Sequence, residues 1–207
     1  MRRAAPAINA ATRLLVLLAA AGLLGWADSW QALRAAAARV TSIQAAFVQE
    51  KHLPILAQPL VSEGLFVFQR PDRMRWEYRH PVRSLLLLAE GRVQRYVQAG
   101  DGLAPERGAG LQAMDMILAE MRLWLSGDFE RSPAFAARLD PAGRVVLTPR
   151  DGALAGFIQR IELELDERPG VIEAVTIYEG PDSFTRIRFS GVRLNQPLDP
   201  SLFGDPS

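Results

Sequence analysis

The spacing of apolar residues predicts two amphipathic helices. The first runs from Trp30 to about Val40, where apolar side chains recur at intervals of three and four residues. The second runs from Leu111 to Leu125 with the same spacing, and Gly127 is suited to end it. Each helix would present one apolar stripe to the rest of the protein.

Between these helices, apolar and polar residues alternate, which is typical of strands. Pro71-Asp72 and Glu90-Gly91 separate alternating runs and favour hairpins. Residues 99–110 carry four glycines and are predicted to form a mobile loop. The predicted strands are Ser42–Glu50, Glu63–Gln69, Arg73–Arg79, Ser84–Ala89 and Arg92–Gln98.

Alternation returns after the second helix and predicts about four more strands. Every turn between them contains glycine, which favours antiparallel meanders. The order of elements lacks the strand–helix alternation of a parallel nucleotide-binding sheet. We therefore predict an α+β, mainly β fold. These strands are Arg144–Pro149, Phe157–Asp166, Val171–Glu179 and Phe184–Leu194.

The strand faces indicate an enclosed apolar interior. One predicted strand carries Phe66 and Phe68 on one face and further apolar residues on the other, so the sheet needs cover on both sides. The next strand carries Met74, Trp76 and Tyr78 on one face and charged residues on the other. A charged exterior and large inner residues suit a curved antiparallel sheet, although an ordinary packed core remains the alternative.

Two other segments extend this interior. The strand predicted from Phe157 has an apolar face that runs from Phe157 itself to Leu165. The second helix carries Met114, Met116 and Met121 within eight residues. Thioether side chains repack easily around variable apolar guests, which favours a binding cavity over a fixed core.

Residues 1–27 have the pattern of a cleavable signal peptide. Three arginines precede or begin an apolar run of about 12 residues, and small residues at positions 25 and 27 precede a cleavage site before Asp28. That run is shorter than the roughly 18 residues of a transmembrane helix, which argues against the alternative of an uncleaved anchor. We expect residues 28–207 to form one exported domain.

Composition and charge exclude several classes of function. The 207 residues include 24 basic and 23 acidic side chains, a net charge of +1 that gives no basic surface for nucleic acid. Removing residues 1–27 changes the net charge to −2. The chain has no cysteine, so disulfides and thiolate chemistry are excluded.

The residues typical of catalysis or metal binding are missing. His52 and His80 are each followed within two residues by proline, which places both in loops. Glu162, Glu164 and Asp166 share the charged face of one strand, where a solvated exterior explains them. No nucleophile elbow, phosphate-binding loop or zinc motif occurs. We therefore expect no enzymatic activity, no catalytic residues, no cofactor and no metal.

Several short motifs occur together in one order along the first half of the chain. With them, the chain resembles the periplasmic outer-membrane lipoprotein carrier (LolA-type) family. The second half agrees more loosely, and the resemblance covers nearly all of residues 30–203. The motifs are Phe47–Lys51, Gly64–Pro71, Arg75-Trp76-Glu77, Pro81 and Glu90-Gly91, followed by Val146–Pro149, Phe184–Phe189, Asn195, Leu198 and Phe203.

This resemblance implies an incomplete antiparallel β-barrel, closed by helices that act as a lid over an apolar cavity. It also implies a monomeric carrier that accepts acylated lipoproteins from an inner-membrane ABC exporter and passes them to an outer-membrane receptor lipoprotein. The arginine of the family's R-P pair latches the lid, and that position is Arg70 here. The lipid-binding residues we expect are Phe66, Phe68, Met74, Trp76, Tyr78, Met114, Ile117 and Met121.

Two alternatives of related fold stay open. Related carriers serve other lipids, such as polyenes or glycolipids, so the cargo need not be a lipoprotein. A periplasmic sensor of the same fold would bind lipid or lipoprotein signals and control a membrane partner.

The mature protein is predicted to begin at or near Asp28. Intact mass and N-terminal sequencing of the protein from a periplasmic extract should show loss of residues 1–27. An exported form that begins at Met1 would contradict the targeting prediction.

Overall fold

The computed structural model describes residues 29–106 and 110–206, without the side chains of residues 110–116. The predicted signal peptide lies outside the described residues. The first six strands are β1 (Ser42–His52), β2 (Leu60–Gln69), β3 (Arg73–His80), β4 (Ser84–Ala89), β5 (Arg92–Ala99) and β6 (Gly102–Pro105). The others are β7 (Phe135–Leu139), β8 (Val145–Pro149), β9 (Arg160–Leu165), β10 (Ile172–Tyr178) and β11 (Phe184–Leu194).

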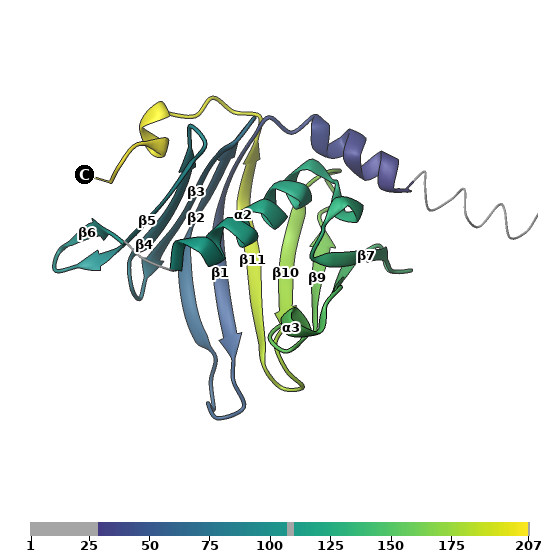
Figure 1. Ribbon diagram of the computed structural model, residues 1–207. Helices are drawn as coiled ribbons and strands as arrows, with labels where there is room; N and C mark the ends of the chain where they lie inside the picture. The colour runs from purple at the N-terminus through teal and green to yellow at the C-terminus, as the bar shows by residue number, and fades with distance from the viewer. Residues whose placement is uncertain (1–28, 107–109, 207) are drawn as a thin grey trace, which may run out of the picture.

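In these residues the eleven strands form one curved antiparallel sheet (Figure 1). Its order is β6-β5-β4-β3-β2-β1-β11-β10-β9-β8-β7, so β6 and β7 are its two edges and the barrel stays open. The predicted mainly β class and the curved antiparallel sheet with helices are therefore confirmed. The helices are residues 29–38, α2 (Gly110–Ser126) and α3 (Gly152–Ala155), with 3-10 turns η1 (Phe129–Arg131) and η2 (Pro200–Phe203).

Four sequence predictions need correction. His52 and His80, predicted to lie in loops, are the last residues of β1 and β3 and pair with Phe184 and Glu63. The glycine-containing segment from residue 99 includes β6, which pairs with β5. β7 was missed; it pairs with β8 at the other edge. Phe157 does not begin an inner strand face: it follows α3, precedes β9 and is 75% exposed. The Asp151 side chain caps α3 by accepting a hydrogen bond from Leu154 N, so helix geometry replaces strand alternation there.

The sheet consists of two meanders joined at its centre. β1–β6 and β7–β11 each pair with their sequence neighbours, and β1 pairs with β11 to join the two halves. α2 connects β6 to β7 and therefore has to run from one edge of the sheet to the other. Figure 1 shows α2 crossing in front of β1, β11 and β10. The topology thus places this helix over the concave face.

The end of the N-terminal helix is fixed by contacts from two distant parts of the chain. Asn195 donates through Nδ2 to Arg39 O at 3.1 Å, and its Oδ1 accepts from Thr41 N at 2.7 Å. Gly170 lies so close that an added Cβ would be 2.7 Å from the backbone at Ala36. Residues 29–38 are therefore anchored beside the β1–β11 seam.

The convex face is covered by the C-terminal segment. Arg75 donates to Leu202 O at 3.0 Å, and Tyr96 donates its hydroxyl hydrogen to Asp205 at 2.7 Å. Burial and the neighbouring Asp205 carboxylate raise the pKa of Tyr96 to about 12, so this hydroxyl stays a donor at neutral pH. On β2, Val67 is fully buried on one face and Phe66 is buried on the other, as expected for a sheet covered twice.

Gly64 is the glycine whose replacement should most disturb the sheet. A Cβ there would overlap the Glu77 carbonyl oxygen and lie 2.6 Å from a ring carbon of Phe47, which crosses over Gly64 from β1. We expect Gly64→Ala to destabilise the protein by about 2–3 kcal/mol, because the two neighbouring strands have to shift. Thermal unfolding should show a Tm lower by roughly 5–10 °C.

Gly102→Ala is the matched control, because no atom lies within 4 Å of the added Cβ. Its Tm should stay close to that of the unchanged protein. Equal unfolding temperatures for the two variants would contradict the close packing of Phe47 over Gly64.

Candidate functional site

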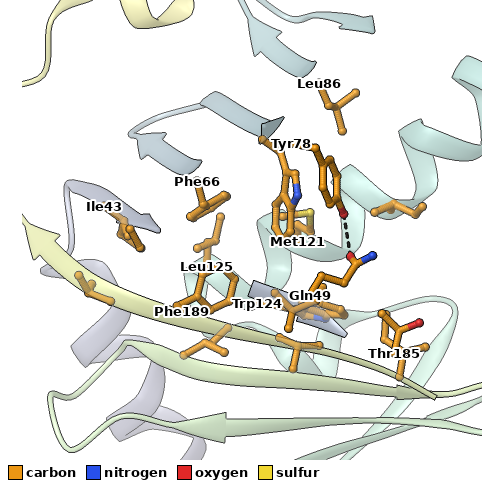
Figure 2. Close-up of a pocket in the computed structure, with 18 of the residues that line it drawn as sticks. Ile43, Gln49, Phe66, Tyr78, Leu86, Met121, Trp124, Leu125, Thr185 and Phe189 are labelled. Atoms are coloured by element: carbon orange, nitrogen blue, oxygen red, sulfur yellow. Dashed lines mark hydrogen bonds between the residues drawn. The ribbon is translucent and has the colours of Figure 1, made fainter. Parts of the chain in front are cut away.

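An apolar cavity of about 380 Å³ lies between α2 and the concave face of the sheet (Figure 2). Strands from both meanders contribute to its wall, so the cavity spans the β1–β11 seam. Its size falls within the usual range of small-molecule sites. Its large apolar lining residues include Ile43, Phe66, Trp76, Leu86, Ile177, Ile187 and Phe189 from the sheet and Ile117, Met121, Trp124 and Leu125 from α2.

Strand register places the aromatic residues of the wall side by side. Phe66 on β2 pairs with Trp76 on β3, and Trp76 pairs with Leu86 on β4. Phe189 on β11 completes the group, with its ring 5.7 Å from that of Phe66 and 6.0 Å from that of Trp76. Alternation of side chains along each strand then turns all four toward the same face. The wall is therefore built by register rather than by a loop.

Five of the residues expected to bind lipid line this cavity: Phe66, Trp76, Tyr78, Ile117 and Met121. Phe68 and Met74 do not line it. Both are buried in the adjacent core, where they belong to one packed cluster with Leu118 of α2. The side chain of Met114 lies outside the described residues.

The cavity wall carries a small polar group beside its aromatic residues. Tyr78 donates its hydroxyl hydrogen to Gln49 Oε1 at 2.7 Å, as the dashed line in Figure 2 shows. Burial raises the pKa of Tyr78 above its ordinary value, and the nearby Trp76 side chain and Arg95 charge offset part of this rise. Arg95 also lines the cavity, and its Nη1 lies 2.6 Å from Glu106 Oε2.

Arg70, the residue after β2, binds the C-terminal end of the N-terminal helix. Its Nε donates to Val40 O at 2.7 Å and its Nη2 donates to Ala37 O at 3.0 Å. These carbonyls belong to the last turn of that helix and the residues just after it, where backbone acceptors lack partners within the helix. A guanidinium suits this place because it is always charged and offers donors in two directions.

α2 is held differently. Its Leu118, Met121 and Leu125 pack against the core cluster that contains Phe68 and Met74. Its buried Glu120 accepts a hydrogen bond from Ser132 Oγ at 2.8 Å, close to the start of β7. Apolar packing and one hydrogen bond near the sheet edge thus keep α2 over the cavity.

The described residues show no group that points to metal chemistry or membrane crossing. Across residues 29–106 and 110–206, no cluster of three or more His, Asp or Glu side chains could hold a metal ion. In that same part of the chain, no helix is long and apolar enough to span a membrane.

A family comparison agrees with this arrangement. The family model described as outer membrane lipoprotein carrier protein LolA matches residues 38–204, which includes every strand of the sheet. The chain belongs to the LolA family. The resemblance inferred from the short sequence motifs is therefore confirmed.

Two relatives within the LolA family show how far the similarity extends. An outer-membrane lipoprotein carrier protein of Alkalilimnicola ehrlichii is 28% identical over 170 residues, 79% of this chain and 73% of its own. That of Halorhodospira halophila is 29% identical over 143 residues, 69% of this chain and 64% of its own. Among solved structures, a LolA superfamily protein of Nitrosomonas europaea aligns with a TM-score of 0.42 and 13% identity, covering 84% of this chain and 97% of its own.

Sequence reasoning missed the part of the cavity wall that comes from the second meander, β7–β11. Val175 and Ile177 on β10 and Ile187 and Phe189 on β11 all line the cavity. Their alternation was visible in the sequence. The sequence did not show that these residues line the same cavity as those of the first meander. That depends on the pairing of β1 with β11, two strands that are far apart in the chain.

Proposed function

We propose that this protein is a periplasmic carrier that shields the acyl chains of lipoproteins, or of a related lipid, in the cavity beneath α2. It would take its cargo from an inner-membrane ABC exporter and deliver it to an outer-membrane receptor lipoprotein. The proposal does not involve catalysis or a cofactor. The observation that carries it is the cavity lined by Phe66, Trp76, Met121 and Phe189 in a member of the LolA family.

The chemistry of the cavity suits an acyl chain. Each methylene transferred from water to an apolar site contributes about 0.8 kcal/mol, so a few buried methylenes already give useful affinity. The aromatic rings of the wall and the flexible thioether of Met121 can adapt to chains of different shape. Directed delivery then requires a receptor that binds the cargo more tightly than the carrier does.

In this proposal, Arg70 is the latch that keeps the lid closed in the empty protein. Its two hydrogen bonds hold the end of the N-terminal helix against β2. One hydrogen bond contributes a net free energy of about 1 kcal/mol. The closed state would therefore be favoured over the open state by only a few kcal/mol, and binding of cargo could open the lid.

Native mass spectrometry of the protein purified from the periplasm without detergent tests the cargo. We expect added mass that organic solvent removes and that corresponds to an acylated peptide or lipoprotein. A phospholipid, polyene or glycolipid adduct would keep the lipid-binding role and replace the lipoprotein cargo. An empty protein that also fails to accept lipoprotein in a transfer assay would contradict the carrier function.

Replacing Arg70 by leucine should increase binding of an apolar dye to the empty protein. Loss of both hydrogen bonds to Val40 and Ala37 weakens closure, so we expect the fraction of open protein to rise on the order of tenfold. Dye fluorescence during a titration measures this change.

Arg92→Leu is the matched control, because Arg92 lies on an exposed hairpin and its guanidinium pairs with exposed Glu90. Dye binding by that variant should equal that of the unchanged protein. If Arg70→Leu also leaves dye binding unchanged, Arg70 is a structural residue and not a latch.

A further inference from the structure

Two indole N–H groups are buried at the cavity without a partner. Trp76 on β3 and Trp124 on α2 both line the cavity. In the described residues, neither Nε1 atom has a hydrogen-bond partner, and both are shielded from solvent. Buried donors without an acceptor are rare in folded proteins, since their loss of hydration is not compensated. A ligand that brings hydrogen-bond acceptors into the cavity would compensate for the lost hydration of these two N–H groups.

Gln49 supplies a third donor on the β1 side. Its Oε1 accepts the hydroxyl hydrogen of Tyr78 at 2.7 Å, and its amide NH2 can donate to a ligand. Tyr78 lies next to Trp76, with ring centroids 6.5 Å apart. The Gln49 amide is therefore a further uncharged donor at this wall, beside the two indole N–H groups.

The charge at the cavity favours a neutral acceptor over an anion. Arg95 lines the cavity, but its guanidinium is paired with the Glu106 carboxylate at 2.6 Å. The available donors of Trp76, Trp124 and Gln49 carry no charge. An anionic headgroup would have to leave water without gaining a free cation, which is unfavourable in an apolar site.

We infer that this cavity recognises an uncharged carbonyl group on its ligand, such as the ester or amide carbonyl that joins an acyl chain to its carrier molecule. Trp76 Nε1 donates to that carbonyl, and Gln49 and Trp124 provide further donors around it. The inference rests on the proposed lipid-binding function and narrows it: acyl esters and amides are bound in preference to plain hydrocarbons and to free fatty acids.

Dye displacement with three chain-matched ligands tests the inference. The probes are methyl myristate, pentadecane and sodium myristate, titrated at pH 7.5 into periplasm-purified protein loaded with an apolar dye. Trp76→Phe and Trp124→Phe each keep an aromatic ring and remove one N–H. We expect Trp76→Phe to weaken methyl myristate binding about three- to tenfold, the range for one neutral hydrogen bond, and to change pentadecane binding less than twofold.

Trp30→Phe is the matched control, because Trp30 is buried against Phe129 in the second core cluster and does not line the cavity. It should change the binding of neither ligand. In the unchanged protein, methyl myristate should bind more tightly than myristate.

Three results would overturn the inference. Equal weakening of ester and hydrocarbon by Trp76→Phe would show lost packing rather than a lost hydrogen bond. Tighter binding of myristate than of its methyl ester would show an anion site at Arg95. Failure of all three ligands to displace the dye would remove the lipid-binding function as well, so that outcome is distinguishable from failure of carbonyl recognition alone.

Discussion

The requirement that α2 joins the two edges of the sheet shapes the rest of this structure. In a flat sheet, ten strand spacings would separate β6 from β7 by roughly 48 Å. The 17 residues of α2 span only about 25 Å. The other residues between Pro105 and Phe135 add to this reach, and because the sheet curls, α2 crosses its concave side (Figure 1). The curl creates the concave space, and the same helix covers it.

The N-terminal helix and α2 are held by different forces. The N-terminal helix is fixed by directional hydrogen bonds. Arg70 and Asn195 donate these bonds to carbonyl oxygens at its C-terminal end. α2 is held mainly by the burial of Leu118, Met121 and Leu125. An apolar ligand can replace contacts of the second kind without leaving polar groups unpaired, whereas the first kind has to be broken. The protein therefore combines one helix held by specific hydrogen bonds with one held by adaptable apolar packing.

Periodicity in the sequence was sufficient for most elements and for one face of the cavity. Alternation located β1–β5, and the face shared by Trp76 and Tyr78 is the face that lines the cavity. It failed where local chemistry competes with alternation, as at Phe157 after the capped turn of α3. It also could not separate Phe68 and Met74 from Phe66, because all three are buried in one core cluster and only Phe66 also lines the cavity. Pairing between strands that are distant in the sequence, such as β1 and β11, leaves no local pattern of residues from which it could be predicted.

The seam between β1 and β11 joins parts of the chain that are far apart in the sequence, which has a consequence for folding. Hairpins within each meander close over a few residues, but the seam joins Thr41 to Asn195, 154 residues apart. Closing so long a loop costs about 2 kcal/mol more entropy than closing a ten-residue hairpin. We therefore expect the seam to form late in folding, because non-local strand pairs have to pay this entropy before they gain contacts. Before β11 pairs with it, β1 would be an unpaired edge of the first meander, and such edges favour aggregation.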